Sequence, residues 1–288
     1  MKWRGNRESS NVEIGSSSTG RGGGIKMGFT GIIIVVVLGL IMGKNPLEML
    51  GMVSQMQQQA PATANTPADP NAPVSQEQQF SKVVLASTED VWGQIFQANK
   101  QQYPAPTMVL FQGSVQSACG GATSASGPFY CPGDQKVYLD TQFFDEMKSK
   151  LGGGGDFAQA YVIAHEVGHH IQTITGTSDK VNQVRAKGGQ VEGDGGLLVR
   201  QELQADCYAG LWAHFAQQEK QWMEPGDLES AIRTAQAIGD DTLQRQSQGS
   251  VVPDAFSHGT AEQRMAWFTR GFESGNINQC DTFSATNL

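Results

Sequence analysis

Residues 156–174 read DFAQAYVIAHEVGHHIQTI and contain the motif H-E-V-G-H at residues 165–169. Apolar residues recur through this stretch at helical spacing, which predicts a single helix. Residues i and i+4 lie on the same face of a helix, so the imidazoles of His165 and His169 can reach one metal ion. Glu166 lies beside them, where its carboxylate can hold a water molecule at the metal instead of binding the metal.

A second predicted helix, from about Leu198 to Gln218, carries two acids at the same spacing, Glu202 and Asp206. A catalytic zinc site uses three protein ligands and keeps a fourth position open, and two histidines with one glutamate form a known set. We therefore predict that Glu202 is the third ligand of one zinc ion per chain. Asp206 is predicted to accept a hydrogen bond from a liganding histidine and so fix its tautomer. The alternative is a solvated helix face in which Glu202 pairs with Arg200.

Four other polar side chains are candidates for this site. His258 precedes a predicted helix N-terminus, where it could donate to a developing oxyanion, and it is a second catalytic candidate with a structural role as the alternative. Arg264 is either an active-site residue or a structural partner of the helix carboxylates. His170 points about 100° away from His169, which favours a core or supporting role. His214 lies about three turns beyond the predicted ligand, which favours an ordinary position on the helix.

These motifs resemble those of the bacterial neutral zinc metallopeptidase family, membrane-anchored proteins of the zincin superfamily. The matching stretches are A-H-E-V-G-H-H at 164–170, E-L-Q-A-D-C-Y-A-G at 202–210, S-A-C-G at 117–120, G-P-F-Y-C-P at 127–132 and V-Y-L-D at 137–140. The resemblance covers about residues 80–275 and the N-terminal anchor architecture.

The resemblance implies a gluzincin-type site with zinc on His165, His169 and Glu202. In that family Glu166 would be the catalytic base and Asp206 would support a ligand. The segment around His258 is also similar to one in the membrane-embedded CAAX prenyl peptidases, although those read H-P where this chain has His258-Gly259.

The expected fold is α+β and zincin-like, mostly helical with a small sheet whose edge strand borders the active-site helix. Lys136–Asp140 is expected to be that edge strand and to pair with an extended substrate. The further expectations are a helix capped by Thr88, a strand over 108–111, a long loop over 177–197, a helix capped by Asp227, a last helix opened by Thr260, and Gly176 as the stop of the first helix.

An uncharged apolar stretch, residues 27–43, is bracketed by Lys26 and Lys44. Its 17 residues would reach roughly 25 Å as a helix, near the ~30 Å of a bilayer core, and flanking lysines can extend that reach. We interpret it as a single-pass anchor. A cleaved signal peptide is the alternative, but no small-x-small cleavage site follows. The excess of Lys and Arg before it predicts a cytoplasmic N-terminus and a periplasmic domain at the bacterial inner membrane.

The anchor divides the chain into four predicted parts. Residues 1–26 are expected to be a disordered cytoplasmic tail. Residues 44–79, rich in Gln, Ala and Pro, are expected to be a disordered linker, because they cannot bury enough apolar surface to offset their ordering entropy. Residues 80–288 would then form the zinc domain.

The charge is unevenly distributed. Residues 1–44 hold six Lys/Arg and two acids, and the whole chain has 20 Lys/Arg against 28 acids, so residues 45–288 carry a net charge of −12. An acidic domain is a poor partner for phosphates, so nucleic acid is not expected as a ligand.

The four cysteines, an even number in a chain expected to face an oxidising compartment, favour disulfides. Three pairings are open. We favour Cys119–Cys131, which would close the Gly/Ser-rich loop between them, and Cys207–Cys280; four buried free thiols are the alternative.

Together these features predict a membrane-anchored zinc metalloendopeptidase that acts on a protein or peptide substrate. In the proposed reaction zinc activates a water molecule and Glu166 is the general base. The alternative is an inactive, membrane-tethered zinc-binding interaction module of the cell envelope.

Overall fold

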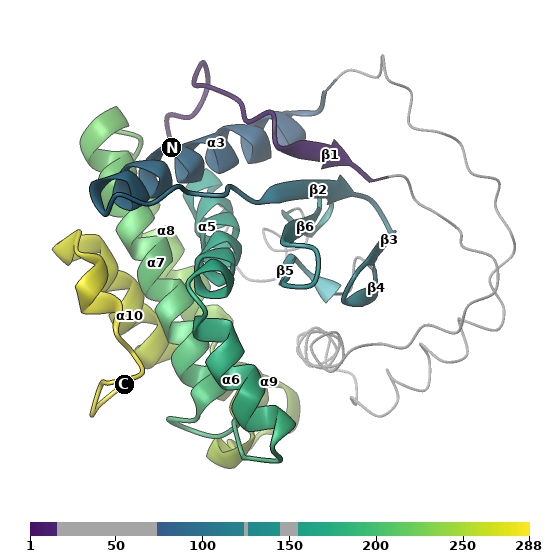
Figure 1. The fold of residues 1–288 in the computed structure, drawn as a ribbon, viewed down its shortest axis with the longest axis vertical. Helices are drawn as coiled ribbons and strands as arrows, with labels where there is room; N and C mark the ends of the chain where they lie inside the picture. The colour runs from purple at the N-terminus through teal and green to yellow at the C-terminus, as the bar shows by residue number, and fades with distance from the viewer. Residues whose placement is uncertain (16–73, 124–125, 145–154) are drawn as a thin grey trace, which may run out of the picture.

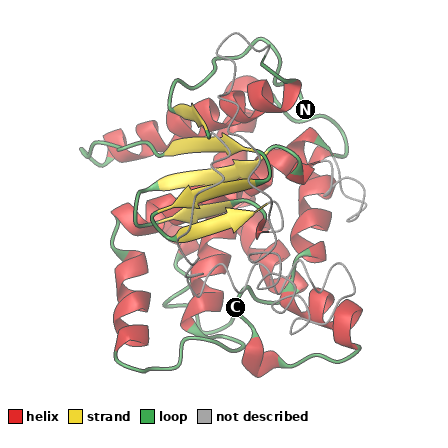
Figure 2. Cartoon of the chain, turned by 90° about the vertical axis from the view of Figure 1, so that its right-hand side faces the viewer, coloured by secondary structure: helices red, strands yellow, loops and turns green. Residues whose placement is uncertain are grey.

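The computed structural model describes residues 1–15, 74–123, 126–144 and 155–288. A body of helices lies beside a small sheet, as Figures 1 and 2 show, which confirms the α+β expectation. The helices are α3 (Gln76–Ala98), α5 (Asp156–Ile174), α6 (Thr177–Ala186), α7 (Leu197–Lys220), α8 (Asp227–Ala237), α9 (Asp240–Gln248) and α10 (Ala261–Ser274). Short 3-10 turns lie at Pro253–Ala255 and Ile277–Cys280.

The main sheet has the strand order β1-β2-β6-β5, formed by Val12–Ile14, Thr107–Phe111, Lys136–Asp140 and Phe129–Cys131. β1, β2 and β6 are parallel, and β5 is antiparallel to β6. β3 (Ser114–Ser117) and β4 (Gly120–Thr123) form a separate antiparallel hairpin.

This order corrects one prediction and confirms another. Lys136–Asp140 is not an edge strand, because β6 is paired on both sides, with β2 and with β5. The outer strand that packs against the active-site helix α5 is β5. The expectation that an edge strand borders that helix is therefore confirmed, with a different strand in the role.

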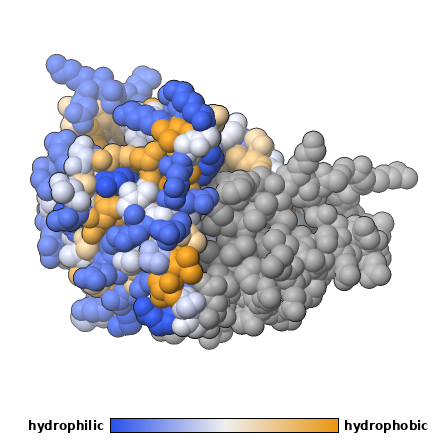
Figure 3. Space-filling model, turned by 90° about the horizontal axis from the view of Figure 1, so that it is seen from below, coloured by the Kyte–Doolittle hydropathy of each residue, from blue (hydrophilic) through white to orange (hydrophobic). Residues whose placement is uncertain are grey.

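The two motif helices, α5 and α7, pack closely because of a small-residue contact. A Cβ added at Gly168 of α5 would lie 3.0–3.2 Å from the Cα, carbonyl oxygen and Cβ of Ala205 in α7. The surrounding core contains fully buried large side chains, among them Trp3, Trp92, Trp212, Trp222 and Phe157. Hydrophilic residues cover much of the surface seen in Figure 3, with smaller apolar patches between them.

Three element boundaries differ from the sequence predictions. α3 begins at Gln76 rather than at Thr88, because Ser75 and Gln78 form a capping box and the following apolar residues are buried. Part of the expected loop over 177–197 is a helix, α6, which buries Val181 against the body. Asp227, predicted to cap a helix, is instead the first residue of α8, and Gly226 is its N-cap.

Other predictions are confirmed. Gly176 follows α5 with a left-handed φ of 78°. Thr260 opens α10 with a capping box. The disulfides are Cys119–Cys131 and Cys207–Cys280, as favoured, with Cα atoms 5.8 and 5.5 Å apart.

The N-terminal segment does not fit its prediction. Residues 1–15 are part of the fold, so the expectation of a disordered tail is wrong for this stretch, because Trp3 enters the core and β1 pairs with β2. The predicted anchor at 27–43 and residues 44–73 of the predicted linker lie outside the described residues. None of the helices in the described residues combines the length and the apolar character that a membrane span requires.

Candidate metal centre

The structure brings together the three predicted metal ligands. His165 and His169 project from α5, and Glu202 projects from α7. The Nε2 atom of His165 lies 3.2 Å from Oε2 of Glu202, and Nε2 of His169 lies 3.4 Å from Oε1. One ligand atom from each residue lies within 4.8 Å of the others. The i, i+4 spacing on one helix and the close approach of the second therefore converge at one point.

The donor set fits zinc. Zinc takes histidine nitrogen and carboxylate oxygen at about 2.0–2.2 Å in a tetrahedral arrangement, so neighbouring ligand atoms should lie about 3.3 Å apart. The two nitrogen–oxygen distances in the structure, 3.2 and 3.4 Å, agree with that spacing. Three protein ligands leave one tetrahedral position for water or substrate, as in catalytic sites.

Both imidazoles are oriented through their second nitrogen. Nδ1 of His165 lies 2.8 Å from Oδ1 of Asp206, and Nδ1 of His169 lies 2.9 Å from Oε1 of Gln172. Because the carboxylate and the amide oxygen only accept, each Nδ1 carries the proton and Nε2 is directed toward the shared ligand position. The predicted place of Asp206 is thus found in the structure. Gln172, three residues after His169, was missed.

Asp206 is held by more than the histidine. It is fully buried, and Arg264 forms a bidentate pair with it, with Nε–Oδ2 2.9 Å and Nη2–Oδ1 3.0 Å. The hydroxyl of Tyr161 also donates to Oδ1, at 2.5 Å. Of the two roles considered for Arg264, the structure shows the structural partner of a helix carboxylate. Tyr161, one turn before His165 on α5, was not identified from the sequence.

The electrostatics follow from buried charges of opposite sign. Burial alone would lower the pKa of His165, but Asp206 and Glu202 outweigh it and raise this pKa to about 10. Burial would raise the pKa of Glu202, yet the two histidines hold it well below its ordinary value. Burial also opposes the shift at Asp206, whose pKa Arg264 and His165 lower to about 2. The carboxylates are therefore ionised at neutral pH, as metal ligands and their partners must be.

Glu166 lies next to the triad and is almost completely buried. Burial raises the pKa of its carboxyl group, and the charges of the histidines and a backbone hydrogen bond from Tyr130 partly oppose that shift. Tyr130 lies in β5, so the outer strand of the sheet contacts the candidate base through its main chain. A raised carboxyl pKa suits a general base that works near neutral pH.

His258 lies near the triad and has a partner that the sequence did not reveal. Its Nδ1 lies 3.2 Å from Oδ1 of Asp240, whose Oδ2 accepts the backbone N–H groups of Ser257, His258 and Gly259 at 2.6–3.1 Å. Opposite charges couple His258 and Glu202: each shifts the pKa of the other toward its charged form. Asp240 thus fixes both the loop and the ring.

The other two histidines have structural partners. His170 bridges the carbonyl oxygen of Pro104, 2.6 Å from Nε2, and the hydroxyl of Tyr130, 3.1 Å from Nδ1. His214 contacts the carbonyl oxygen of Phe272 in α10. These contacts agree with the non-ligand roles favoured for both residues.

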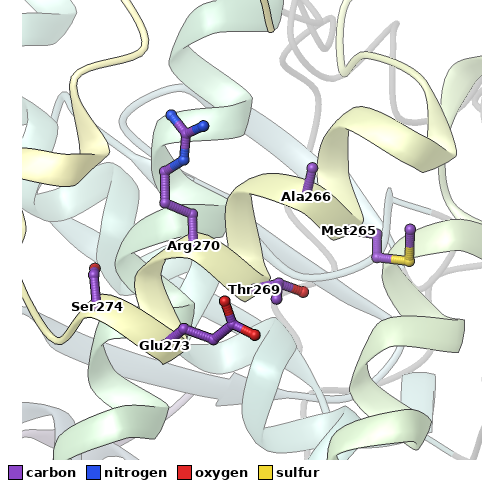
Figure 4. A pocket seen from close by; sticks show the side chains of 6 residues that line it. All are labelled: Met265, Ala266, Thr269, Arg270, Glu273 and Ser274. Carbon is purple, nitrogen blue, oxygen red and sulfur yellow. The ribbon is translucent and has the colours of Figure 1, made fainter.

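A cavity lies along α10 (Figure 4), and none of the predicted ligands is among the described residues that line it. Within the described residues its lining comes from that helix alone: Met265, Ala266, Thr269, Arg270, Glu273 and Ser274. Arg264, on the same helix, faces inward to Asp206.

Comparison with known proteins places the chain in a family. A family described as "Putative neutral zinc metallopeptidase" matches residues 1–283. The Escherichia coli K12 protein YpfJ is 47% identical over 98% of this chain and 99% of its own length. The Mycobacterium bovis protein Mb2605 is 45% identical over 65% of each chain. No solved structure matches. Since the match extends over nearly the whole sequence, the chain belongs to the neutral zinc metallopeptidase family.

Proposed function

We propose that this protein is a zinc-dependent metalloendopeptidase that hydrolyses peptide bonds at the His165–His169–Glu202 centre. The observation that carries the proposal is the convergence of these three side chains, at distances that suit zinc, beside the buried carboxyl group of Glu166. A zinc ion there would act as a Lewis acid and lower the pKa of a bound water from 15.7 toward about 7.

The protein's own groups supply the proton transfers. Glu166 lies in a buried environment that raises its pKa, which favours uptake of a proton from the attacking water and its return to the leaving amine. Such general acid–base catalysis contributes roughly 10²–10⁴-fold to a rate. Asp206 and Gln172 hold the two imidazoles in the tautomer that presents Nε2.

His258 is proposed to stabilise the oxyanion of the tetrahedral intermediate. Its Nδ1 hydrogen bond to Asp240 leaves Nε2 available, and burial, which would lower its pKa, is outweighed by Asp240, so the pKa is raised. A protonated imidazole can donate to developing negative charge on the substrate. The Asp240 carboxylate would hold the ring in that orientation.

An extended substrate is proposed to pair with β5. This strand is the outer strand of the described sheet on the side of α5, and its Tyr130 already contacts Glu166 through the backbone. Main-chain pairing would bind peptides of many sequences, because it uses groups that every residue has. It would also place the scissile bond beside the base.

The compartment is proposed to be extracytoplasmic. Two disulfides with Cα–Cα distances in the ordinary range support this, because disulfides persist in oxidising environments and are rare in the cytosol. Both cysteines of Cys207–Cys280 are almost completely buried.

The proposal is tested with the full chain, loaded with zinc, and an unfolded protein such as reduced casein as the probe. Glu166→Gln should bind zinc as the wild type does and lose cleavage by at least 10²-fold, because the amide cannot take a proton. Glu219→Gln, on the outer part of α7, is the matched control and should cleave normally. Cleavage by Glu166→Gln at the wild-type rate would exclude this mechanism. Bound zinc without any cleavage of casein or of a random peptide library would favour the non-catalytic interaction module.

A further inference from the structure

The N-terminal segment of this chain is bound to the zinc domain through a buried tryptophan. The Trp3 side chain is 1% exposed and meets the ring of Phe80 edge to face, with centroids 5.4 Å apart. Its indole N–H donates to Oδ2 of Asp156 at 2.7 Å. Asp156 is the first residue of α5, the helix that carries both histidine ligands. The segment therefore contacts the helix on which the metal centre is built.

A second set of contacts joins the segment to α3. The guanidinium group of Arg7 binds Glu89 at 3.0 Å, Asp90 at 2.7 Å and the carbonyl oxygen of Ala86 at 2.7 Å. The side chain of Asn11 donates to the same Glu89 at 2.8 Å. These are charge-assisted hydrogen bonds, which are stronger than neutral ones and fix the geometry of the contact.

The third set of contacts is a strand. β1 pairs in parallel with β2, with Val12 opposite Met108 and Ile14 opposite Leu110. The backbone N–H of Gly15 donates to Leu110, and Lys136 of β6 forms an ion pair with Glu13 at 2.7 Å. Without β1, the main-chain groups of β2 on this side would lose their partners, and unpaired strand edges are a liability in proteins. Figure 1 shows β1 beside β2, with α3 next to both.

These contacts restrict how the chain can cross a membrane. A single crossing between residues 15 and 74 would put the N-terminal segment on the opposite side from α3, α5 and β2. All three sets of contacts would then be lost, leaving the Trp3 cavity and the β2 edge open. The match to the family begins at residue 1, so this segment belongs to the shared sequence and is not an addition to it.

We propose that residues 1–15 and residues 74–288 lie on the same side of any membrane that this protein contacts. The proposal replaces the sequence prediction of a cytoplasmic N-terminus and an external domain separated by one crossing. It does not depend on the proposed peptidase activity, because it rests on packing against α3, β2 and the first residue of α5, none of which is a predicted ligand or the candidate base.

Thiol labelling of the full chain in spheroplasts tests the proposal. All four native cysteines are paired, so a new cysteine at exposed Ser10 or exposed Ser250 gives one reactive site each. A membrane-impermeant maleimide is added to intact and to lysed spheroplasts. We expect Ser10→Cys and Ser250→Cys to show the same pattern, with the ratio of intact to lysed labelling equal within about twofold. Labelling of one variant in intact spheroplasts and of the other only after lysis, with a ratio differing by tenfold or more, would overturn the proposal.

A zero-length crosslink tests the packing itself. A carbodiimide should join Lys136 to Glu13 in the purified full chain, and mass spectrometry should find the linked peptides. Glu13→Gln should abolish this crosslink and leave the fold intact, because this ion pair is on the surface. Absence of the crosslink in the wild type, with other surface pairs such as Lys220–Asp90 linked normally, would also contradict the proposal.

Discussion

Replacement of Gly168 by alanine tests how the two motif helices create the metal centre. Gly168 lies between Glu166 and His169 on α5, and the added Cβ would lie 3.0 Å from the Cα of Ala205 on α7, 3.1 Å from its carbonyl oxygen and 3.2 Å from its Cβ. Ordinary contacts begin at 3.4 Å, so the helices must separate by about 0.4 Å at this point. Glu202 lies three residues before Ala205 and would move with α7.

The expected magnitude combines two opposite effects. Overpacking of a core costs about 1–3 kcal/mol, whereas alanine in a helix is favoured over glycine by about 0.8–1.0 kcal/mol. We therefore expect Gly168→Ala to lower the free energy of unfolding by about 1 kcal/mol. Because a displacement of a few tenths of an ångström changes the distances between ligands, zinc affinity should fall about 10- to 100-fold.

Gly93→Ala is the matched control. Gly93 is also within a helix, α3, but an added Cβ there meets nothing within 4 Å. This variant should stabilise the protein by about 0.5–1 kcal/mol and leave zinc affinity unchanged. The assays are urea denaturation of both variants and competition for zinc with a chelator. If Gly168→Ala binds zinc as tightly as the wild type and is stabilised like Gly93→Ala, close helix packing does not set the site.

Four further predictions concern Asp206, His165 and Trp3. Asp206→Asn should lower zinc affinity about 10- to 100-fold, because the residue orients His165. It should also destabilise the fold by about 3 kcal/mol, because Arg264 keeps a buried charge without its partner. Chelator competition measures the affinity and urea denaturation the stability; an unchanged affinity would exclude the role of Asp206 in orienting His165. The pKa of Asp206 is lowered to about 2, so its ionised carboxylate contributes about 2 kcal/mol to the free energy of unfolding. This contribution is complete above pH ~4 and is lost as the pH falls through about 2. Urea denaturation at pH values in this range should show the loss in the wild type and not in Asp206→Asn. The pKa of His165 is raised to about 10 without metal, so zinc binding at pH 7 should release at least one proton. Calorimetry in buffers of different ionisation enthalpy should detect this release. Zero release would contradict a protonated His165 in the metal-free protein. Trp3→Ala should cost about 3–5 kcal/mol in urea denaturation, because it leaves a cavity and an unpaired Asp156, and a cost below 1 kcal/mol would show that the segment contributes little.

The sequence predicted the residues that are identified by their spacing along one helix. His165 and His169 share a helix face, Glu202 and Asp206 share another, and both helices are found with nearly the predicted bounds. The favoured disulfide pairs are also confirmed. In these cases a period, a cap or a count of cysteines constrains the structure without knowledge of the packing.

The features that were missed depend on contacts between distant residues. Asp240 lies 18 residues before His258, and Trp3 lies 153 residues from its partner Asp156. Residues 1–15 are rich in charged residues and have no periodic pattern. Their fold depends on the pocket that buries Trp3 and on the edge of β2 that pairs with β1, and neither can be read from the sequence. The choice of β6 as the edge strand failed for the same reason, because strand order is a property of the whole sheet.

We propose that His165, His169 and Glu202 together hold one catalytic zinc ion. The most direct test is the zinc content of the purified full chain, measured by plasma mass spectrometry beside Glu202→Ala and the surface control Glu219→Ala. We predict about one zinc per chain in the wild type and in Glu219→Ala, and loss of most of it in Glu202→Ala. Zinc that is absent from the wild type, or that is retained in full by Glu202→Ala, would contradict this account.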